Sequence, residues 1–257
     1  MTLPKTIVKA EVLAHKLIGP EVCELTLKAS GLVQMARPGQ FVHVRVADTI
    51  VPLLRRPISI ADANAAAGTL TLIYRIVGHG TELLAQTLPG SRLDLMGPLG
   101  NGFVLEAERP LLVGGGIGLA PLVYLAKALC TSPITIVMGG RNKNEMYWQD
   151  IFQSICQNIH ITTDDGSMGR QGFTVDVIDD ILTGDSFDMV YACGPRPMLE
   201  GVARLAKERN VRCQVSLEDH MACGVGACLS CTCAATDGKR RKVCTDGPVF
   251  WAEEVFD

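Results

Sequence analysis

Alternating apolar and polar positions dominate the first hundred residues. This period of two is typical of half-buried antiparallel strands. Pro-Gly and Ala-Gly pairs mark turns between the segments, and one short helix is expected over 80–88. Many short strands separated by turns favour a β-barrel, which we assign to residues 1–101. The clearest expected strands cover 7–13, 22–27, 41–46, 70–77 and 92–96.

The rhythm changes after residue 101, where apolar runs of strand length alternate with segments of helix length. Alternating β and α elements predict a doubly wound parallel sheet, assigned to residues 102–213. The segment 214–257 is too short for a core of its own, and we expect it to depend on a bound cluster and on docking to the sheet domain. The expected strands are 110–113, 134–138, 160–163, 189–192 and 211–217, and the expected helices are 120–130, 145–156, 173–182 and 197–208.

Composition and charge exclude several functional classes. A net charge of −3 offers no electrostatic footprint for nucleic acid, and the one basic run, 239–242, is expected to be a solvated loop tip. The longest uncharged stretch, 110–126, contains four glycines, which argues against a membrane span. No signal peptide is evident. Ten cysteines without a secretion signal predict a reducing cytoplasm and thiols used for metal.

Four cysteines near the C-terminus carry the most specific chemical signal. Cys223, Cys228, Cys231 and Cys244 have the spacing C-x4-C-x2-C-x12-C. The first three match the plant-type pattern of a [2Fe-2S] cluster, and the glycines between them permit positive φ angles. Cys228 and Cys231 alone also fit a structural zinc site, which would be colourless. Cys233 adds a fifth thiol that could be confused with Cys231.

The other cysteines have less specific surroundings. Cys23, Cys130, Cys156 and Cys213 fall in apolar strand or helix patterns, so we expect ordinary buried thiols. Cys193 either lines a nicotinamide pocket or is a buried structural thiol.

A glycine-rich loop predicts nucleotide binding in the second segment. It follows an apolar strand and precedes a helix, which allows a pyrophosphate to approach the backbone and the helix N-terminus. The spacing is not G-x-G-x-x-G, and a plain strand-to-helix turn is the alternative. A second loop closes the fourth strand of the same sheet, and ligands bind at such strand ends. The candidate residues are Gly114, Gly115, Gly116, Gly118, Cys193, Gly194 and Pro195.

The first segment contains a candidate flavin motif, Arg56-Pro57-Ile58-Ser59. Arg56 could neutralise a pyrophosphate and Ser59 could hydrogen-bond a flavin edge, although a surface strand with an arginine would look the same. Arg141 could favour the extra phosphate of NADPH, so the choice between NADH and NADPH stays open.

The order of these motifs along the whole chain resembles the ferredoxin–NADP reductase superfamily, in which a β-barrel binds FAD and an α/β domain binds the nicotinamide nucleotide. The run from Asp219 to Cys228, with the run from Val243 to Phe250, looks like the electron-transfer subunits of class 1B dihydroorotate dehydrogenase. The resemblance implies cluster ligands at the four cysteines. It also implies FAD contacts at Arg56, Pro57, Ile58, Ser59, Ile73, Tyr74, Arg75, Gly80 and Thr81.

The resemblance further implies a partner, an FMN-containing catalytic subunit, in a heterotetramer with two copies of each chain. Dihydroorotate would be oxidised on that partner, in pyrimidine (UMP) biosynthesis, and NAD+ would be reduced on this chain. NAD(H) exchanges two electrons with FAD, whereas the cluster takes one at a time. The chain has no room for a (β/α)8 barrel of about 250 residues beside its two domains, and none of its residues is assigned to dihydroorotate chemistry.

Other subunits of the same build are alternatives. They are the small subunit of NADH-dependent ferredoxin–NADP oxidoreductase and the γ subunit of sulfhydrogenase.

Overall fold

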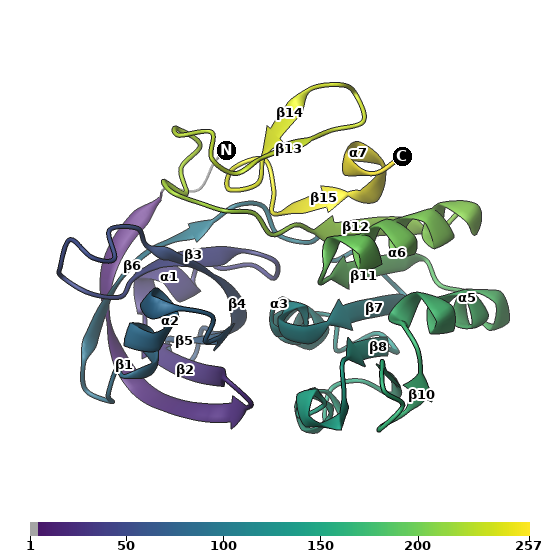
Figure 1. The fold of residues 1–257 in the computed structure, drawn as a ribbon, viewed down its shortest axis with the longest axis horizontal. Coiled ribbons are helices and arrows are strands. Elements are labelled where there is room, and N and C mark those ends of the chain that lie inside the picture. Colours follow the sequence, from purple (N-terminus) through teal and green to yellow (C-terminus); the bar gives the residue numbers. More distant parts are fainter. Residues whose placement is uncertain (1–4) are drawn as a thin grey trace.

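A computed structural model describes residues 5–257 and contains a six-stranded closed barrel at the N-terminal side (Figure 1). Neighbouring strands are antiparallel in the order β1-β2-β5-β4-β3-β6, so the expected barrel is confirmed. Two short helices accompany it, α1 (Ser30–Val33) and α2 (His79–Ala85). The strands are β1 (Thr6–Gly19), β2 (Val22–Lys28), β3 (Phe41–Arg45), β4 (Arg56–Asn64), β5 (Thr69–Arg75) and β6 (Arg92–Leu99).

The first strand is longer than its alternation predicts. It pairs with β6 through its first half and with β2 through its second half, with register shifts after Val12 and after Leu17. Each shift changes the face on which the following side chains lie. Much of the second half is exposed, so the apolar pattern stops at residue 13 while the ladder of hydrogen bonds continues.

The second unit is a sheet covered by helices on both faces, as expected. Its strand order is β10-β9-β8-β7-β11-β12-β15, and the strands from β10 to β12 are parallel. The strands are β7 (Pro110–Gly115), β8 (Thr135–Gly140), β9 (Asn158–Thr163), β10 (Arg170–Gln171), β11 (Met189–Cys193) and β12 (Arg212–Ser216). The helices are α3 (Leu119–Ala128), α4 (Trp148–Phe152), α5 (Thr174–Gly184) and α6 (Arg196–Glu208).

The helix expected over 145–156 is wrong in length, because α4 has five residues. The segment before it forms a short 3-10 turn, η2 (Lys143–Glu145), whose start is capped by the side chain of Asn142. The carboxylate of Glu145 is bound to Arg141 instead of continuing a helix face. A second 3-10 turn, η1 (Gly116–Gly118), follows β7.

The C-terminal tail, residues 217–257, lies across the top of both units (Figure 1). It contains the hairpin β13 (Thr232–Ala234) and β14 (Arg240–Lys242), the strand β15 (Val249–Trp251) and the helix α7 (Ala252–Val255). Strand β15 pairs antiparallel with β12 and so extends the parallel sheet. The expected docking of the tail onto the sheet domain is confirmed, although neither β15 nor the two-residue strand β10 was predicted.

Two smaller expectations are wrong. The basic run 239–242 is not a loop tip, because Arg240–Lys242 forms β14 and Arg240 donates to Thr232 across the hairpin. Cys130 is exposed, since α3 ends at Ala128 and the chain turns there. Cys23, Cys156 and Cys213 are buried as expected.

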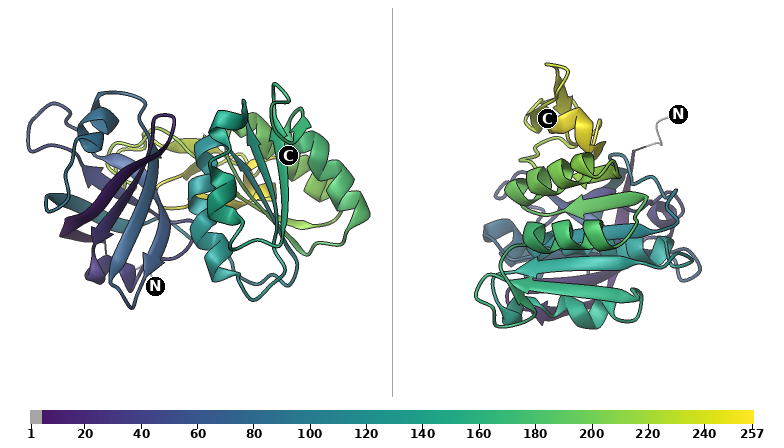
Figure 2. Two further views of the ribbon diagram at one scale, coloured as in Figure 1. Left: turned by 90° about the horizontal axis from the view of Figure 1, so that it is seen from below. Right: turned by 90° about the vertical axis from the view of Figure 1, so that its right-hand side faces the viewer.

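One face of the barrel is covered by the sheet unit and the tail. Inside the barrel, Val42 and Val44 of β3 pack in the barrel core. The alternate residues of β3 point outward, and Phe41 belongs to the core that contains tail residues. Ile73 of β5 packs in the core formed with α3. The views in Figure 2 show the barrel beside the sheet and the tail above the sheet. Within residues 5–257, no helix combines the length and apolar composition needed to cross a bilayer.

Candidate functional site at the junction of barrel, sheet and tail

The expected flavin motif begins strand β4. The guanidinium of Arg56 lies against Gly80 at the start of α2, so closely that a Cβ at residue 80 would overlap it. Ser59 is half-buried opposite Phe41, and its hydroxyl has no hydrogen-bond partner among residues 5–257. Ile58 instead points into the barrel core. The motif therefore presents one cation and one free hydroxyl, the two groups that the sequence singled out.

The hydroxyl of Thr81 is already engaged. It donates to the carbonyl of Gly78 at 2.8 Å and accepts from the N–H groups of Val77 and Gly78 at 2.9 and 3.2 Å. These bonds secure the start of α2 beside Arg56. Thr81 thus positions the loop, while Gly80 leaves the space that the guanidinium fills.

The Ile73-Tyr74-Arg75 segment divides between two faces of β5. Ile73 and Arg75 face the sheet unit, whereas Tyr74 points into the barrel and contacts Nε2 of His15 at 2.9 Å. Burial raises the pKa of Tyr74 far above its usual range. The side chain of Tyr74 is therefore structural, and any cofactor contact at this residue would be made by its backbone.

The two loops expected to bind nucleotide lie side by side. Gly114 and Cys193 are directly opposite each other on the parallel strands β7 and β11. A Cβ at Gly118 would lie 2.5 Å from the carbonyl oxygen of Cys193, and one at Gly115 would lie 3.1 Å from Pro195. Gly116 has a positive φ of 56°. Side chains would separate these loops, so the glycines are needed for their close approach.

Cys193 is half-buried at the carboxyl end of β11. Burial raises the pKa of its thiol to about 12, although a hydrogen bond with Ser216 opposes the rise. Gly194 packs against Gly115 and Met198. The thiol is thus protonated at neutral pH, and both interpretations of Cys193 remain compatible with its position at the mouth of the glycine loop.

An ion-pair network links the barrel to this nucleotide loop. Glu145 is within 3.9 Å of Arg75 and accepts hydrogen bonds from the side chain of Arg141 at 2.7 Å and from its backbone at 3.0 Å. Burial opposes ionisation of Glu145, but these hydrogen bonds and charges outweigh it and hold its pKa below the usual value. Arg141 therefore has a carboxylate partner already.

The four expected cluster cysteines form two contacting pairs in the tail. The N–H groups of Val225 and Cys228 both point at Sγ of Cys223, at 3.4 Å. The thiol of Cys228 donates to Cys223, and the thiol of Cys244 donates to Cys231. Cys231 and Cys244 are buried, and Cys228 is exposed. Within residues 5–257, no three His, Cys, Asp or Glu side chains are grouped as ligands of one metal ion.

The backbone around Cys223 favours a thiolate. Burial raises its pKa, but the N–H groups of Val225 and Cys228 outweigh that effect and lower the pKa to about 6. Gly224 and Gly226 have φ angles of 68° and 82°. A loop with inward N–H groups and no side chains at these glycines has the character required to hold an anionic iron–sulfur cluster, so the residues present fit that group.

Cys233 lies apart from this arrangement. It is the central residue of β13, is buried in the core beneath the tail, and burial raises its pKa. The interaction of Cys244 is with Cys231, and none with Cys233 is found in the described part of the chain. The geometry therefore supports Cys231 over Cys233 as the third ligand.

Residues just after the last barrel strand, β6, hold the tail by hydrogen bonds. The backbone N–H of Asn101 donates to the carbonyl of Gly247 at 2.7 Å, and its side-chain amide donates to the carbonyl of Asp246 at 2.8 Å. The N–H of Leu217 bonds to the carbonyl of Pro248 at 2.8 Å. The segment after Cys244 is thus held by both other units. The local sequence pattern around Asn101 does not predict this role.

His43 is a further residue that the sequence patterns did not single out. It is fully buried on β3, and neither ring nitrogen has a hydrogen-bond partner among the described residues. Burial, together with the positive charge of Arg55, lowers its pKa to about 4. The alternation of β3 places His43 on the outward face of the barrel. The tail, which lies far along the sequence, covers this face, so the pattern around His43 does not reveal its burial.

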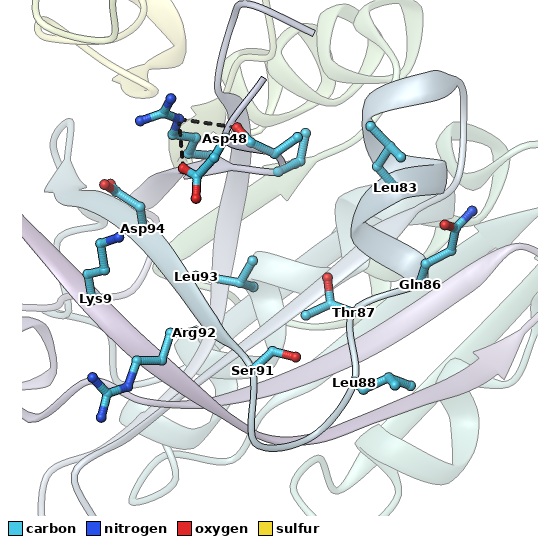
Figure 3. A pocket seen from close by; sticks show the side chains of 13 residues that line it. Lys9, Asp48, Leu83, Gln86, Thr87, Leu88, Ser91, Arg92, Leu93 and Asp94 are labelled. Atoms are coloured by element: carbon cyan, nitrogen blue, oxygen red, sulfur yellow. Dashed lines mark hydrogen bonds and ion pairs between the residues drawn. The ribbon is translucent and has the colours of Figure 1, made fainter. Parts of the chain in front are cut away.

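A surface pocket of about 360 Å³ lies beside α2 (Figure 3). Leu83 and Gln86 come from the helix, and Lys9 and Asp94 face each other across β1 and β6. None of the expected cofactor residues lines it. This pocket is therefore separate from the junction described above.

Comparison with known proteins identifies the family. Residues 218–256 match the iron-sulfur cluster binding domain of dihydroorotate dehydrogenase B, and residues 112–204 match the oxidoreductase NAD-binding domain. The dihydroorotate dehydrogenase B (NAD(+)) electron transfer subunit of Bacillus caldolyticus is 46% identical over 95% of this chain and 96% of its own length. That of Caldanaerobacter subterraneus subsp. tengcongensis is 40% identical over 96% of this chain and 98% of its own. The chain belongs to this family.

Membership of this family makes the chain an NAD-linked oxidoreductase component. The expected cofactor set of FAD, a [2Fe-2S] cluster and NAD(H) is confirmed by the matched domains and the fold. A solved structure of an NADH-dependent reduced ferredoxin-NADP oxidoreductase is 33% identical, with a TM-score of 0.86 over 96% of this chain and 90% of that chain. A ferredoxin reductase of carbazole 1,9a-dioxygenase, at 24% identity and a TM-score of 0.68, shares the fold over 82% of this chain and 68% of its own.

Proposed function

We propose that electrons cross this subunit between a nucleotide site at the β7 and β11 loops, a flavin site at β4 and a cluster site in the tail. One observation carries this order. Strand β3 is hydrogen-bonded to the flavin motif, with Phe41 opposite Ser59 and His43 opposite Pro57. The same strand touches the cysteine loop, because the ring of His43 lies against Gly224. The flavin and cluster sites are thus separated by a single strand.

We assign the cluster to Cys223, Cys228, Cys231 and Cys244, supported by the contacts among their thiols. FAD supplies the conversion between two-electron exchange with NAD(H) and one-electron exchange with the cluster. The N–H groups of the loop after Cys223 donate to sulfur, which stabilises the negative charge that a cluster carries.

At the flavin site we assign positive charge to Arg56 and Arg75 and a hydrogen bond to the hydroxyl of Ser59. Arg56 is held by its contact with Gly80, and Arg75 by Glu145. The glycine loop after β7 would hold the nucleotide phosphates, because its backbone is open to close approach. The remaining contacts assigned to FAD, at Pro57, Ile58, Ile73, Tyr74, Gly80 and Thr81, rest on the family resemblance.

The name of the family implies a separate catalytic subunit. We propose that this partner carries FMN, that dihydroorotate is oxidised there for pyrimidine biosynthesis, and that two copies of each chain assemble. Residues 1–101, 102–213 and 214–257 would serve flavin, nucleotide and cluster respectively. All ten cysteines are unpaired, which is consistent with a location in the reducing cytoplasm.

The likeness to the ferredoxin-NADP oxidoreductase structure supports a second candidate, a subunit of that kind of complex. The match of the tail to the dihydroorotate dehydrogenase B domain favours the first. Co-purification separates the two, because only the first predicts an FMN protein that oxidises dihydroorotate.

Visible spectra of the purified chain, recorded anaerobically before and after NADH, test the proposed path. We expect flavin absorbance over a broad red-brown cluster band, with both bleached by NADH. Flavin bleaching with an unchanged cluster band would contradict electron transfer between the two sites. A colourless, zinc-containing protein would overturn the cluster assignment.

A further inference from the structure

His43 has a chemical environment unlike that of an ordinary structural histidine. His15, in the same barrel, uses both ring nitrogens, with Thr87 at 2.8 Å and Tyr74 at 2.9 Å. His43 is completely buried, yet both of its ring nitrogens are without partners in the described chain. A neutral imidazole carries one N–H donor and one acceptor, and buried polar groups in proteins are nearly always hydrogen-bonded. This ring therefore lacks the hydrogen-bond partner that a buried imidazole normally has.

The packing of the ring indicates which segment would supply that hydrogen-bond partner. A Cβ built on Gly224 would be 2.8 Å from Cε1 of His43 and 3.0 Å from each of its two nitrogens. These near-equal distances place that Cβ position over the face of the ring, so the imidazole lies flat against the loop between Cys223 and Cys228. Gly224, with its φ of 68°, has no side chain to intervene.

The other surroundings of the ring give it no alternative acceptor. Phe41 packs beside it, with ring centroids 5.7 Å apart, and belongs to the apolar core that includes Cys231 and Cys244. The guanidinium of Arg55 approaches the backbone carbonyl of His43 and pairs with Asp94. The cysteine loop is the remaining neighbour of the ring, and sulfur atoms held by that loop would supply an acceptor for a ring N–H.

We propose that His43 is a positioning residue for the iron–sulfur cluster, whose ring N–H donates to a cluster sulfur and raises the reduction potential. The inference rests on the proposed assignment of the cluster to this loop. A hydrogen bond to sulfur stabilises the reduced cluster more than the oxidised one, because the reduced cluster carries more negative charge. Since His43 is cross-strand from Pro57 of the flavin motif, the same contact couples the cluster loop to the flavin strand.

The test is a redox titration of the cluster, followed by electron paramagnetic resonance, in the complex with its catalytic subunit. We expect His43→Leu to lower the equilibrium constant for cluster reduction about tenfold, which is ~59 mV for a one-electron couple. His43→Gln keeps an N–H donor and should retain most of the wild-type potential. His160→Leu, an exposed histidine on β9, is the control and should leave the potential unchanged. Equal potentials in His43→Leu and His160→Leu, at full iron content, would overturn the proposal.

A second measurement does not depend on how the His43 variants fold. The reduced cluster is examined in protein labelled with 15N-histidine, in a His220→Gln background that removes the histidine next to the cysteine loop. We expect a weak 15N hyperfine coupling from the remaining ring beside the cluster, and its absence would refute the contact. Failure to find any cluster signal in wild-type protein would instead refute the proposed function, so the two failures are distinguishable.

Discussion

Replacement of Gly224 by alanine tests the packing between the flavin strand and the cluster loop. Two costs add at this position. A non-glycine residue in the left-handed region costs about 1–2 kcal/mol, and Gly224 has a φ of 68°. The new Cβ would also lie 2.8 Å from the buried ring of His43, and overpacking of this kind costs about 1–3 kcal/mol. We therefore expect Gly224→Ala to destabilise the protein by about 2–5 kcal/mol.

Gly238→Ala is the matched control. Gly238 lies in the same tail with a φ of 77°, but a Cβ there would meet nothing within 4 Å. It should show only the backbone cost of about 1–2 kcal/mol. A chain of this size loses about 2–4 °C of melting temperature per kcal/mol, so the two variants should be separable by calorimetry.

The double variant Gly224→Ala with His43→Ala isolates the steric part. Removing the imidazole frees the space that the new Cβ needs, so the two changes should couple by about 1–3 kcal/mol in a double-mutant cycle. Melting temperature and iron content of the purified protein would be measured for all variants. If Gly224→Ala is no worse than Gly238→Ala, the inferred contact between the ring and the cluster loop is refuted.

Three other expectations concern different parts of the junction. Cys228→Ser should weaken cluster binding by at least about 10-fold while NADH still bleaches the flavin; loss of flavin reduction with an intact cluster band would contradict it. Asn101→Ala removes the side-chain bond to Asp246 and should cost about 1 kcal/mol, measured as a melting shift and as faster proteolysis of the tail; unchanged values of both would contradict it. The pKa of about 12 keeps the thiol of Cys193 protonated at pH 8, so iodoacetamide should modify Cys193 far more slowly than the exposed Cys130. The rate of modification of Cys193 should increase as the pH rises. Equal rates for the two cysteines, measured by mass spectrometry, would refute this.

Local patterns were sufficient to predict the barrel and the parallel sheet. Their strands and helices bury one face or one stripe, so the periodicity is visible in short windows. The spacing of Cys223, Cys228 and Cys231 is also visible in a short window, because these three residues lie within one loop, and their role as cluster ligands stays a prediction. Strands β10 and β15 were not predictable, since two or three residues carry little periodicity. The partner of β15 is β12, more than thirty residues earlier.

The roles of individual residues depended on contacts between distant segments. Tyr74 belonged to an expected cofactor segment, yet its neighbours across the barrel engage its hydroxyl. Asn101 and His43 acquire their roles from the tail, which packs on them from the other end of the chain. The helix expected at 145–156 is shorter in the structure, where Lys143–Glu145 form a 3-10 turn and α4 covers only Trp148–Phe152, a local departure that the apolar pattern does not reveal.

The pairing of β15 with β12 has a consequence for solubility as well as for architecture. A sheet edge exposes unpaired backbone donors and acceptors that can recruit other chains. At one end of this sheet, β10 is only two residues long, and at the other end β15 shields β12. The last residues of the tail thus protect the backbone groups of β12 from pairing with other chains. A protein shortened before residue 249 would expose β12 and tend to aggregate, in addition to losing its hold on the cluster loop.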